Sequence, residues 1–182
     1  TRVATVLAGL DLPDAVEAFD AIRRARPAGL GAVAAEDVAT APLHDLRTAM
    51  GLAADRDRIA WNYVHDYADV FDLGVPALRE GLTLDEPLSA AVVRAYLRFL
   101  VAFPDTHVVR KHGLAAATQV QARAVEVESA YKACEDPAAR ASLVQAFDRE
   151  LKHQGVNPGT SADLTVTSLF AMNLAAALQD AR

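Results

Sequence analysis

The sequence lacks the alternation of β-branched and polar residues that marks half-buried strands, and alanine and leucine dominate it. This pattern predicts helix throughout and an all-α fold. We expect one domain over residues 1–182, built as a bundle of six or seven helices. Hydrophobic residues make up 52% of the chain and charged residues 23%, a balance that excludes an intrinsically disordered protein.

Prolines, glycines and apolar spacing predict where the helices begin and end. A long connection is expected over residues 27–42, with one helical turn near Glu36, and a loop over residues 80–87. Gly74 and Pro76 are expected to end the longest helix. The predicted helices cover residues 3–8, 14–26, 43–73, 88–103, 106–134, 137–153 and 160–179.

Charge and cysteine content narrow the function classes. The net charge is -6, and nucleic-acid binding through the overall field needs a basic surface instead. The single cysteine, Cys134, excludes an intrachain disulfide and a cysteine zinc site, and it suits a reducing compartment. The most apolar run, residues 164–178, is shorter than the ~20 residues of a membrane helix. We therefore expect a cytoplasmic protein that binds neither nucleic acid nor membranes.

One acid falls on the apolar stripe of the stretch 43–73. Asp57 lies between Ala53 and Trp61, and a core-facing carboxylate needs a cation or several hydrogen bonds. It is therefore either a metal or substrate ligand, or the partner of Arg56 or Arg58 in an ion pair. The stripe consists of Leu46, Met50, Ala53, Trp61, Val64, Ala68 and Phe71.

A neighbouring ridge of the same stretch is polar. Its spacing favours a solvated face with i,i+4 pairs. The alternative is a magnesium site, because acids one turn apart supply the oxygen ligands that Mg²⁺ prefers. The ridge consists of Asp55, Arg58, Asn62, Asp66 and Asp69.

The segment PDTHVVRKHG combines a helix cap with a basic cluster. Asp105 follows Pro104 and is expected to cap the next helix. Arg110, Lys111 and His112 then supply three potential cations within one turn, which indicates either a phosphate-binding patch or ordinary surface charges. His112 shares an apolar stripe with Val109, and we expect it to be the buried histidine among the five.

The segment NPGTSADLTV predicts a turn that leads directly into an apolar helix. Thr160 as cap and Asp163 three residues later resemble a capping box. The N–H groups that follow Gly159 would face an anion, although Asp163 would repel a bare phosphate and so require a bridging cation. An ordinary capped helix explains the same pattern.

At NPGTSADL the sequence resembles the triphosphoribosyl-dephospho-CoA synthase family, whose members carry (N/S)PG(T/G)SADL near the C-terminus. The family segment D(T/S)-x-x-x-R-(K/G)-x-G is matched here by Asp105, Thr106, Arg110, Lys111 and Gly113. The segments AIRRARPAGLG, LRTAMGLAADRDRIA and YADVFDLGVPAL resemble a branch associated with one-carbon pterin metabolism in methylotrophs.

The resemblance implies an all-α transferase that uses ATP and 3′-dephospho-CoA. The 2′-hydroxyl of dephospho-CoA attacks the ribose C1 of ATP, adenine leaves, and Mg²⁺ neutralises the triphosphate. Asp57, Asp105 and Asp163 are then the catalytic candidates, with Asp57 and Asp163 as magnesium ligands. The substrate-binding candidates are Arg58, His107, Arg110, Lys111, His112, Asn157, Gly159, Thr160 and Ser161.

Two motifs of the family, a Lys-Pro-Gly segment and one rich in asparagine and glycine, lie upstream of where this sequence begins. The sequence starts at Thr1 with what resembles mid-helix sequence, so we expect the C-terminal portion of a longer family domain. An exposed face left by the missing part would favour homo-oligomers. The alternatives are a ribosyl or phosphoribosyl step in pterin cofactor synthesis, and a non-catalytic protein that binds a nucleotide or a protein partner.

Overall fold

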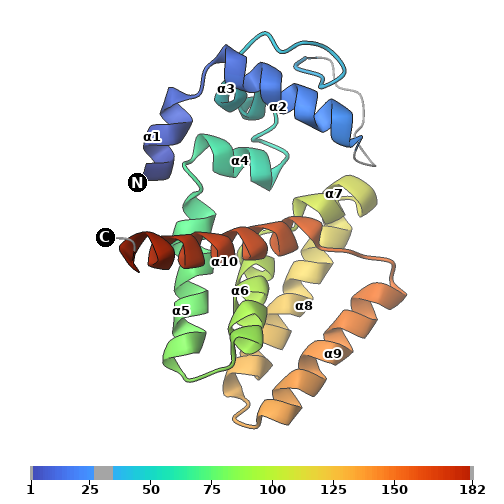
Figure 1. Ribbon diagram of the computed structural model, residues 1–182. Coiled ribbons are helices and arrows are strands. Elements are labelled where there is room, and N and C mark those ends of the chain that lie inside the picture. Colours follow the sequence, from blue (N-terminus) through green and yellow to red (C-terminus); the bar gives the residue numbers. More distant parts are fainter. Residues whose placement is uncertain (1, 27–34, 181–182) are drawn as a thin grey trace. The chain divides into compact units, whose positions relative to one another are not determined.

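The computed structural model describes residues 2–26 and 35–180, which form ten α-helices and one π-helical turn with no strand among them (Figure 1). The predicted all-α class is confirmed, although the helices are shorter and more numerous than expected. The chain divides after Tyr67 into two compact units. Each unit is described separately below.

The first unit contains four helices around a small core. The second helix begins with a capping box, in which the side chains of Asp11 and Asp14 accept from each other's backbone N–H. Glu36 has a left-handed backbone (φ 52°) and lies in bends and turns, so the helical turn expected there is wrong. The rest of the predicted connection, residues 27–34, lies outside the described residues. The helices are α1 (Arg2–Gly9), α2 (Leu12–Ala25), α3 (Leu46–Gly51) and α4 (Arg58–Val64).

The single helix predicted over residues 43–73 is wrong, because the backbone is interrupted twice. After α3 the chain makes turns until Asp57, whose Oδ1 accepts from the backbone N–H groups of Ile59 and Ala60 at 2.8 and 3.1 Å and so caps α4. Asp66 and Tyr67 then adopt left-handed conformations, with φ of 56° and 58°. The apolar stripe read from the sequence is therefore not one helix face, and Asp57 lies at a helix start.

The second unit is organised around the long helix α6 (Leu88–Ala102), which packs against α5, α8, α10 and the π-helical turn (Figure 1). Leu97 and Leu100 of α6 join apolar residues of α8 and α9 in the main core. The other elements are η1 (Val70–Gly74), α5 (Val75–Thr83), α7 (Thr106–His112), α8 (Leu114–Ala133), α9 (Pro137–His153) and α10 (Gly159–Asp180).

Gly74 does not end a helix as predicted. The π-helical turn η1 leads directly into α5, and Pro76 occupies the first turn of α5, where a missing N–H costs no hydrogen bond. A Cβ at Gly74 would lie 2.0 Å from Ser168 Oγ and 2.7 Å from Phe99 Cζ. The glycine therefore allows η1 to pass very close to α10 and α6.

The helix predicted over residues 106–134 is also divided. Gly113 has a φ of 86°, which favours glycine, and it separates α7 from α8. By contrast, the helices predicted over 88–103 and 137–153 are confirmed to within one residue. Asp136 caps the second of these, with Pro137 in its first turn.

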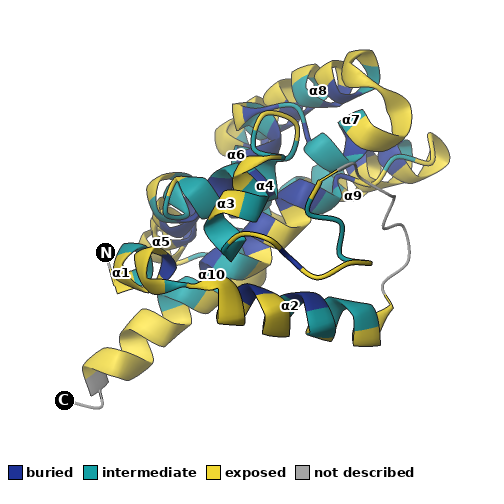
Figure 2. Cartoon of the chain, turned by 90° about the horizontal axis from the view of Figure 1, so that it is seen from above, coloured by how far each residue is buried: buried dark blue, intermediate teal, exposed yellow. Residues whose placement is uncertain are grey.

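Helix α10 is longer than the apolar run that revealed it. By length and composition alone, residues 159–179 could cross a membrane, so the prediction that this stretch is too short is wrong. Its first half nevertheless contributes Ser161, Thr165 and Ser168 as buried polar residues of the second unit. Its last residues are exposed, as the yellow C-terminal end in Figure 2 shows. Composition alone is weak evidence for a membrane span, and 22% of the apolar window is buried.

Candidate functional site

The two family-like motifs meet at Asp105 of the first, which contacts Ser161 of the second, 56 residues further along the chain. This carboxylate is 1% exposed. Its Oδ1 accepts from the backbone N–H groups of His107 and Val108 at 2.9 and 3.1 Å, which confirms the predicted cap of α7. Its Oδ2 accepts from the N–H and the Oγ of Ser161, both at 2.8 Å. Four donors thus hold one buried carboxylate, and they join α7 to the start of α10.

Thr160 makes a second bridge between the same two helices. Its Oγ1 lies 2.9 Å from the Oγ1 of Thr106 and accepts from the backbone N–H of His107 at 3.1 Å. Because α10 begins at Gly159, Thr160 is already inside the helix, and the predicted cap at Thr160 is wrong. Asp163 is exposed and lies beyond the first turn of α10.

For the start of α10 the sequence left two interpretations open, a site for an external anion and an ordinary capped helix. In the structure, the N–H of Ser161 donates to the protein's own carboxylate at Asp105. The N–H of Ala162 donates to the carbonyl of Pro158 at 3.2 Å, and that of Gly159 to the carbonyl of Asn157 at 2.9 Å. Part of the expected anion site is therefore occupied by Asp105 itself, because a carboxylate suits a helix N-terminus as a phosphate does.

His107 links the start of α10 to the basic end of α7. A Cβ at Gly159 would lie 3.1 Å from the Cγ and Nδ1 of its ring, so the ring packs directly against the glycine. The same Nδ1 lies 3.3 Å from a terminal nitrogen of Arg110. Nε2 is buried and has no hydrogen-bond partner in the described part of the chain. The ring of His107 therefore lies close to Gly159 of one motif and contacts Arg110 of the other.

Partial burial, followed by the charges of Lys111 and Arg110, lowers the pKa of His107 below its ordinary value of 6.5. Asp105 and Asp163 act in the opposite sense and are outweighed. The direction of this shift favours the neutral ring, and Lys111 and Asp163 lie near enough to influence its pKa. These two residues thus belong to the same cluster by charge, although no hydrogen bond joins them to the ring.

The three potential cations of α7 are all exposed at its C-terminal end, where they also favour the helix dipole. The prediction that His112 is the buried histidine is wrong. His112 is exposed, and His107 is the one histidine of the five that is partly buried. The error arises because the break at Gly113 changes the register on which the apolar stripe was read.

Asp57 and Arg58 belong to the first unit. The guanidinium of Arg58 lies 3.8 Å from the ring centre of Trp61, and His65 stacks on the same ring at 3.9 Å, so the Trp61 ring is covered by both. The predicted solvated ridge is wrong in two places, since Asn62 is fully buried and Asp69 is 5% exposed. The chemical roles predicted for Asp57 and Arg58 remain predictions.

No group of three or more His, Cys, Asp or Glu side chains within residues 2–26 and 35–180 is arranged to hold a metal ion. The residues present therefore do not fit a resident metal centre, because Mg²⁺ bound by protein alone needs several oxygen ligands. The magnesium expected with ATP, and Asp57 and Asp163 as its ligands, stay predictions.

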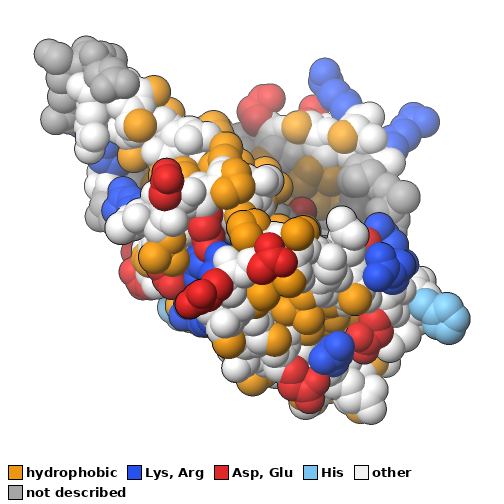
Figure 3. Space-filling model, turned by 90° about the horizontal axis from the view of Figure 1, so that it is seen from below, with side chains coloured by type: hydrophobic (Ala, Val, Ile, Leu, Met, Phe, Trp, Pro, Cys, Tyr) orange, Lys and Arg blue, Asp and Glu red, His pale blue; other side chains and the backbone are white. Residues whose placement is uncertain are grey.

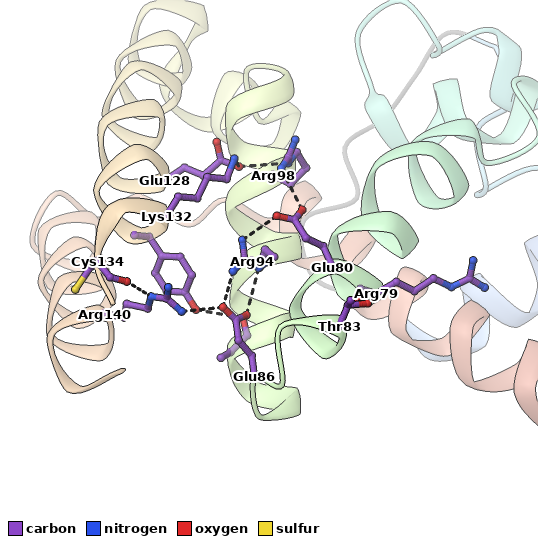
Figure 4. A network of polar contacts seen from close by, with 12 residues as sticks. Arg79, Glu80, Thr83, Glu86, Arg94, Arg98, Glu128, Lys132, Cys134 and Arg140 are labelled. Carbon is purple, nitrogen blue, oxygen red and sulfur yellow. Dashed lines mark hydrogen bonds and ion pairs between the residues drawn. The ribbon is translucent and has the colours of Figure 1, made fainter. Parts of the chain in front are cut away.

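A second polar network lies at the opposite end of α6. Arg94 is 3% exposed; its guanidinium contacts Glu86 at 2.5 Å and Glu80 at 3.2 Å, and Arg140 reaches the same Glu86 oxygen at 2.8 Å (Figure 4). Arg94 and Arg140 also lie over the ring of Tyr131. These charges are balanced by direct partners, so the network ties four elements together and does not present free charge.

Hydrophobic side chains gather between scattered charges on the lower face of the molecule (Figure 3). In the second unit, a groove of about 680 Å³ is lined by Pro87, Val93, Tyr131, Arg140 and Val144, among others. It is separate from the two motifs, which lie at the other end of α6.

Sequence reasoning did not select Thr106 as a site residue, although its hydroxyl joins the motifs. Its position directly after Asp105 in the matched family segment was the available signal. Sequence reasoning also missed the stacking of Arg58 and His65 on Trp61. These residues are three and four positions from Trp61, and that spacing brings them together only in a helix that begins at Arg58, as α4 does.

Known proteins share the sequence pattern and the fold of this chain. Residues 1–181 match the family model of CitG, ATP:dephospho-CoA triphosphoribosyl transferase. The crystal structure of a proposed triphosphoribosyl-dephospho-CoA synthase from Archaeoglobus fulgidus is similar, with a TM-score of 0.65 and 25% sequence identity, over 91% of this chain and 67% of that chain. No curated protein matches significantly. The two motifs that meet at Asp105 are thus found in a chain that belongs to the CitG family of ATP:dephospho-CoA triphosphoribosyl transferases.

Proposed function

We propose that this chain transfers the triphosphoribosyl group of ATP to 3′-dephospho-CoA. The 2′-hydroxyl oxygen of dephospho-CoA forms a bond to the ribose C1 of ATP, and the bond from C1 to N9 of adenine breaks. Adenine leaves with the electron pair and gains a proton, while the attacking hydroxyl loses one. The observation that carries the proposal is the junction at Asp105, because it joins both family motifs into one cluster that includes His107 and Arg110.

The polyphosphate is the part of the substrate that this cluster suits best. The side chains of Arg110 and Lys111 are exposed, and neither forms an ion pair among the described residues. A guanidinium can hold a phosphate with two parallel hydrogen bonds, and an ammonium adds a point charge. His112 lies beside them and is a third candidate. Gly159 and Asn157 border the cluster at the start of α10.

Asp105 is better suited to positioning than to proton transfer. Its two oxygens already accept from four donors, so little acceptor capacity remains for a substrate hydroxyl. Asp163 is exposed and influences His107 by charge. We therefore propose Asp163 as the residue that contacts the magnesium carried by MgATP, through water. Its replacement by Asn should raise the magnesium concentration needed for half-maximal turnover.

A reduced pterin is the alternative acceptor that the resemblance to the methylotroph branch indicates. The segments LRTAMGLAADRDRIA and YADVFDLGVPAL support membership of the methylotroph branch linked to pterin metabolism. Dephospho-CoA and a reduced pterin should therefore be offered separately, each with MgATP. A faster release of adenine with the pterin would favour a ribosyl transfer in pterin cofactor synthesis.

The experiment that tests the proposal is chromatographic detection of adenine after incubation with MgATP and dephospho-CoA. We expect release that depends on both substrates, and a large reduction in the Arg110→Met variant. Arg149→Met is the matched control, because Arg149 is an exposed cation on α9 and belongs to neither motif. Equal release with and without dephospho-CoA, or none at all, would exclude the proposed transfer.

A further inference from the structure

The contact between His107 and Arg110 determines where the proton of the neutral ring lies. A guanidinium has only N–H donors and no acceptor. Nδ1 of His107, which lies 3.3 Å from a terminal nitrogen of Arg110, must therefore accept the hydrogen bond. Nδ1 is therefore unprotonated, and the single ring proton is on Nε2. A doubly protonated ring would turn a second N–H, and a positive charge, toward Arg110.

The surroundings of His107 favour the neutral ring. Burial, Lys111 and Arg110 lower its pKa, and the opposing acids Asp105 and Asp163 do not reverse this direction. Nε2 carries the proton but is buried and has no partner within residues 2–26 and 35–180. A protein seldom leaves a buried donor unpaired without a compensating reason. Here the compensating reason is the hydrogen bond from Arg110, which needs an unprotonated Nδ1 as its acceptor.

The lack of a side chain at Gly159 leaves room for the His107 ring in this orientation. The ring lies so close that a Cβ at this position would be 3.1 Å from both Cγ and Nδ1. The backbone N–H of His107 is fixed as well, since it donates to Asp105 and to Thr160. The glycine of one motif therefore permits this position of the ring, and the ring contacts the arginine of the other motif.

We propose that His107 is a positioning residue for Arg110, which it orients toward a phosphate group by accepting a hydrogen bond at Nδ1. This inference rests on the proposed function for the identity of the phosphate compound, which is ATP or the diphosphate of dephospho-CoA. Arg110 contacts the phosphate, and His107 acts through Arg110. An exposed arginine otherwise samples many rotamers, so fixing its guanidinium reduces the entropy lost on binding.

The first test needs no ligand. ¹⁵N NMR of the full chain distinguishes a ring nitrogen that carries a proton from one that does not. We expect the His107 ring at pH 7.5 to be the Nε2–H form, and Arg110→Met to increase the population of the Nδ1–H form. A wild-type ring protonated at Nδ1 would overturn the proposal.

The second test measures the affinity of the full chain for ATP, and separately for dephospho-CoA, by calorimetry. His107→Leu should weaken binding of the phosphate compound that Arg110 contacts about tenfold, the effect of losing one hydrogen bond to a charged group. His107→Asn places an amide oxygen near the position of Nδ1, so its affinity should stay within about threefold of wild type. His107→Gln extends further, to the position of Nε2, and should behave like His107→Leu.

The effect of His107→Leu should disappear in the Arg110→Met background, because a residue that acts through Arg110 has nothing to orient there. His153→Leu, a change at an exposed histidine on α9, serves as the control. Equal losses in the presence and absence of Arg110 would show that the ring is merely structural. Rescue by Gln and not by Asn would also overturn the proposal, in favour of contact through Nε2. Failure of adenine release alone would count against the proposed transfer and leave both of these tests valid.

Discussion

Ser161 donates two hydrogen bonds to the same oxygen of Asp105, one from its backbone N–H and one from its Oγ, both at 2.8 Å. Both residues are buried, with exposures of 0% and 1%. The start of α10 therefore binds an anion supplied by the chain itself. This relationship fixes the distance between the two family motifs before any substrate arrives.

Removal of this junction should destabilise the second unit. Asp105→Ala leaves three donors without an acceptor, the N–H of Val108 and the N–H and Oγ of Ser161, and should cost about 3 kcal/mol of unfolding free energy. Ser161→Ala should cost about 1–2 kcal/mol. Urea unfolding of the single and double variants measures their coupling. Strictly additive losses would contradict a direct interaction, since contacting pairs couple by about 0.5–3 kcal/mol.

The buried Arg94–Glu86 pair should matter far more than a surface pair. Arg94→Met leaves the carboxylate of Glu86, which is 7% exposed on its side chain, with Arg140 as its remaining ion-pair partner, and should cost about 3 kcal/mol. The control is Lys152→Met, which removes an exposed pair with Asp148 and should change stability by less than about 1 kcal/mol. Thermal melts of the two variants make the comparison. Similar shifts in Tm for both would show that the network of Figure 4 is not a buried structural element.

Gly74 should tolerate no side chain. Gly74→Ala forces a Cβ against Ser168 and Phe99 and should cost about 1–3 kcal/mol or more through overpacking. Gly9→Ala is the control, because a Cβ there meets nothing within 4 Å. Chemical denaturation reports both values. A Gly74→Ala protein as stable as the wild type would contradict this close approach, in which a Cβ at Gly74 lies 2.0 Å from Ser168 Oγ on α10.

The pKa of His107 gives stability a pH dependence of known sign. Because burial, Lys111 and Arg110 lower this pKa below 6.5, the unfolded chain takes up a proton as the pH falls through 6.5 before the folded chain does. The contribution is fully present above pH 6.5 and is lost as the pH falls toward the folded pKa.

NMR titration of the His107 ring tests this directly. The wild-type pKa should lie below 6.5, and Lys111→Met should move it upward by removing a nearby positive charge. A wild-type pKa at or above 6.5 would show that Asp105 and Asp163 dominate the ring, and would reverse the sign of the stability change.

Local sequence signals predicted the fold class and those helices whose ends are chemically marked. The helix 137–153 follows from Asp136 as cap and Pro137 in the first turn, and α7 begins at the cap residue Asp105 as expected. These signals act within three or four residues, so they are readable without tertiary structure.

The errors arose where one local pattern permits two structures. Asp57 fits an apolar helical stripe by spacing, but its side chain instead caps a new helix. Gly74 resembles a helix stop, yet close packing against Ser168 and Phe99 explains it. His112 was chosen over His107 because the left-handed turn at Gly113 cannot be seen from spacing alone. Each outcome depends on long-range packing.

The site was predicted as two separate motifs, and the sequence did not show how they join. The bonds from Ser161 to Asp105 and from Thr160 to Thr106 connect residues more than fifty positions apart. Such pairing cannot follow from the spacing of one sequence. Family resemblance identified the residues, and the structure identified their contacts.

The most direct test of the proposed transfer is mass spectrometry of the reaction of this chain with MgATP and dephospho-CoA. We expect a product that contains dephospho-CoA joined to the triphosphoribosyl group, formed in equal amount with adenine, and strongly reduced in Arg110→Met. Adenine without the joined product would indicate hydrolysis of ATP at the ribose. An unchanged mass of dephospho-CoA together with intact ATP would contradict the transferase activity of this chain.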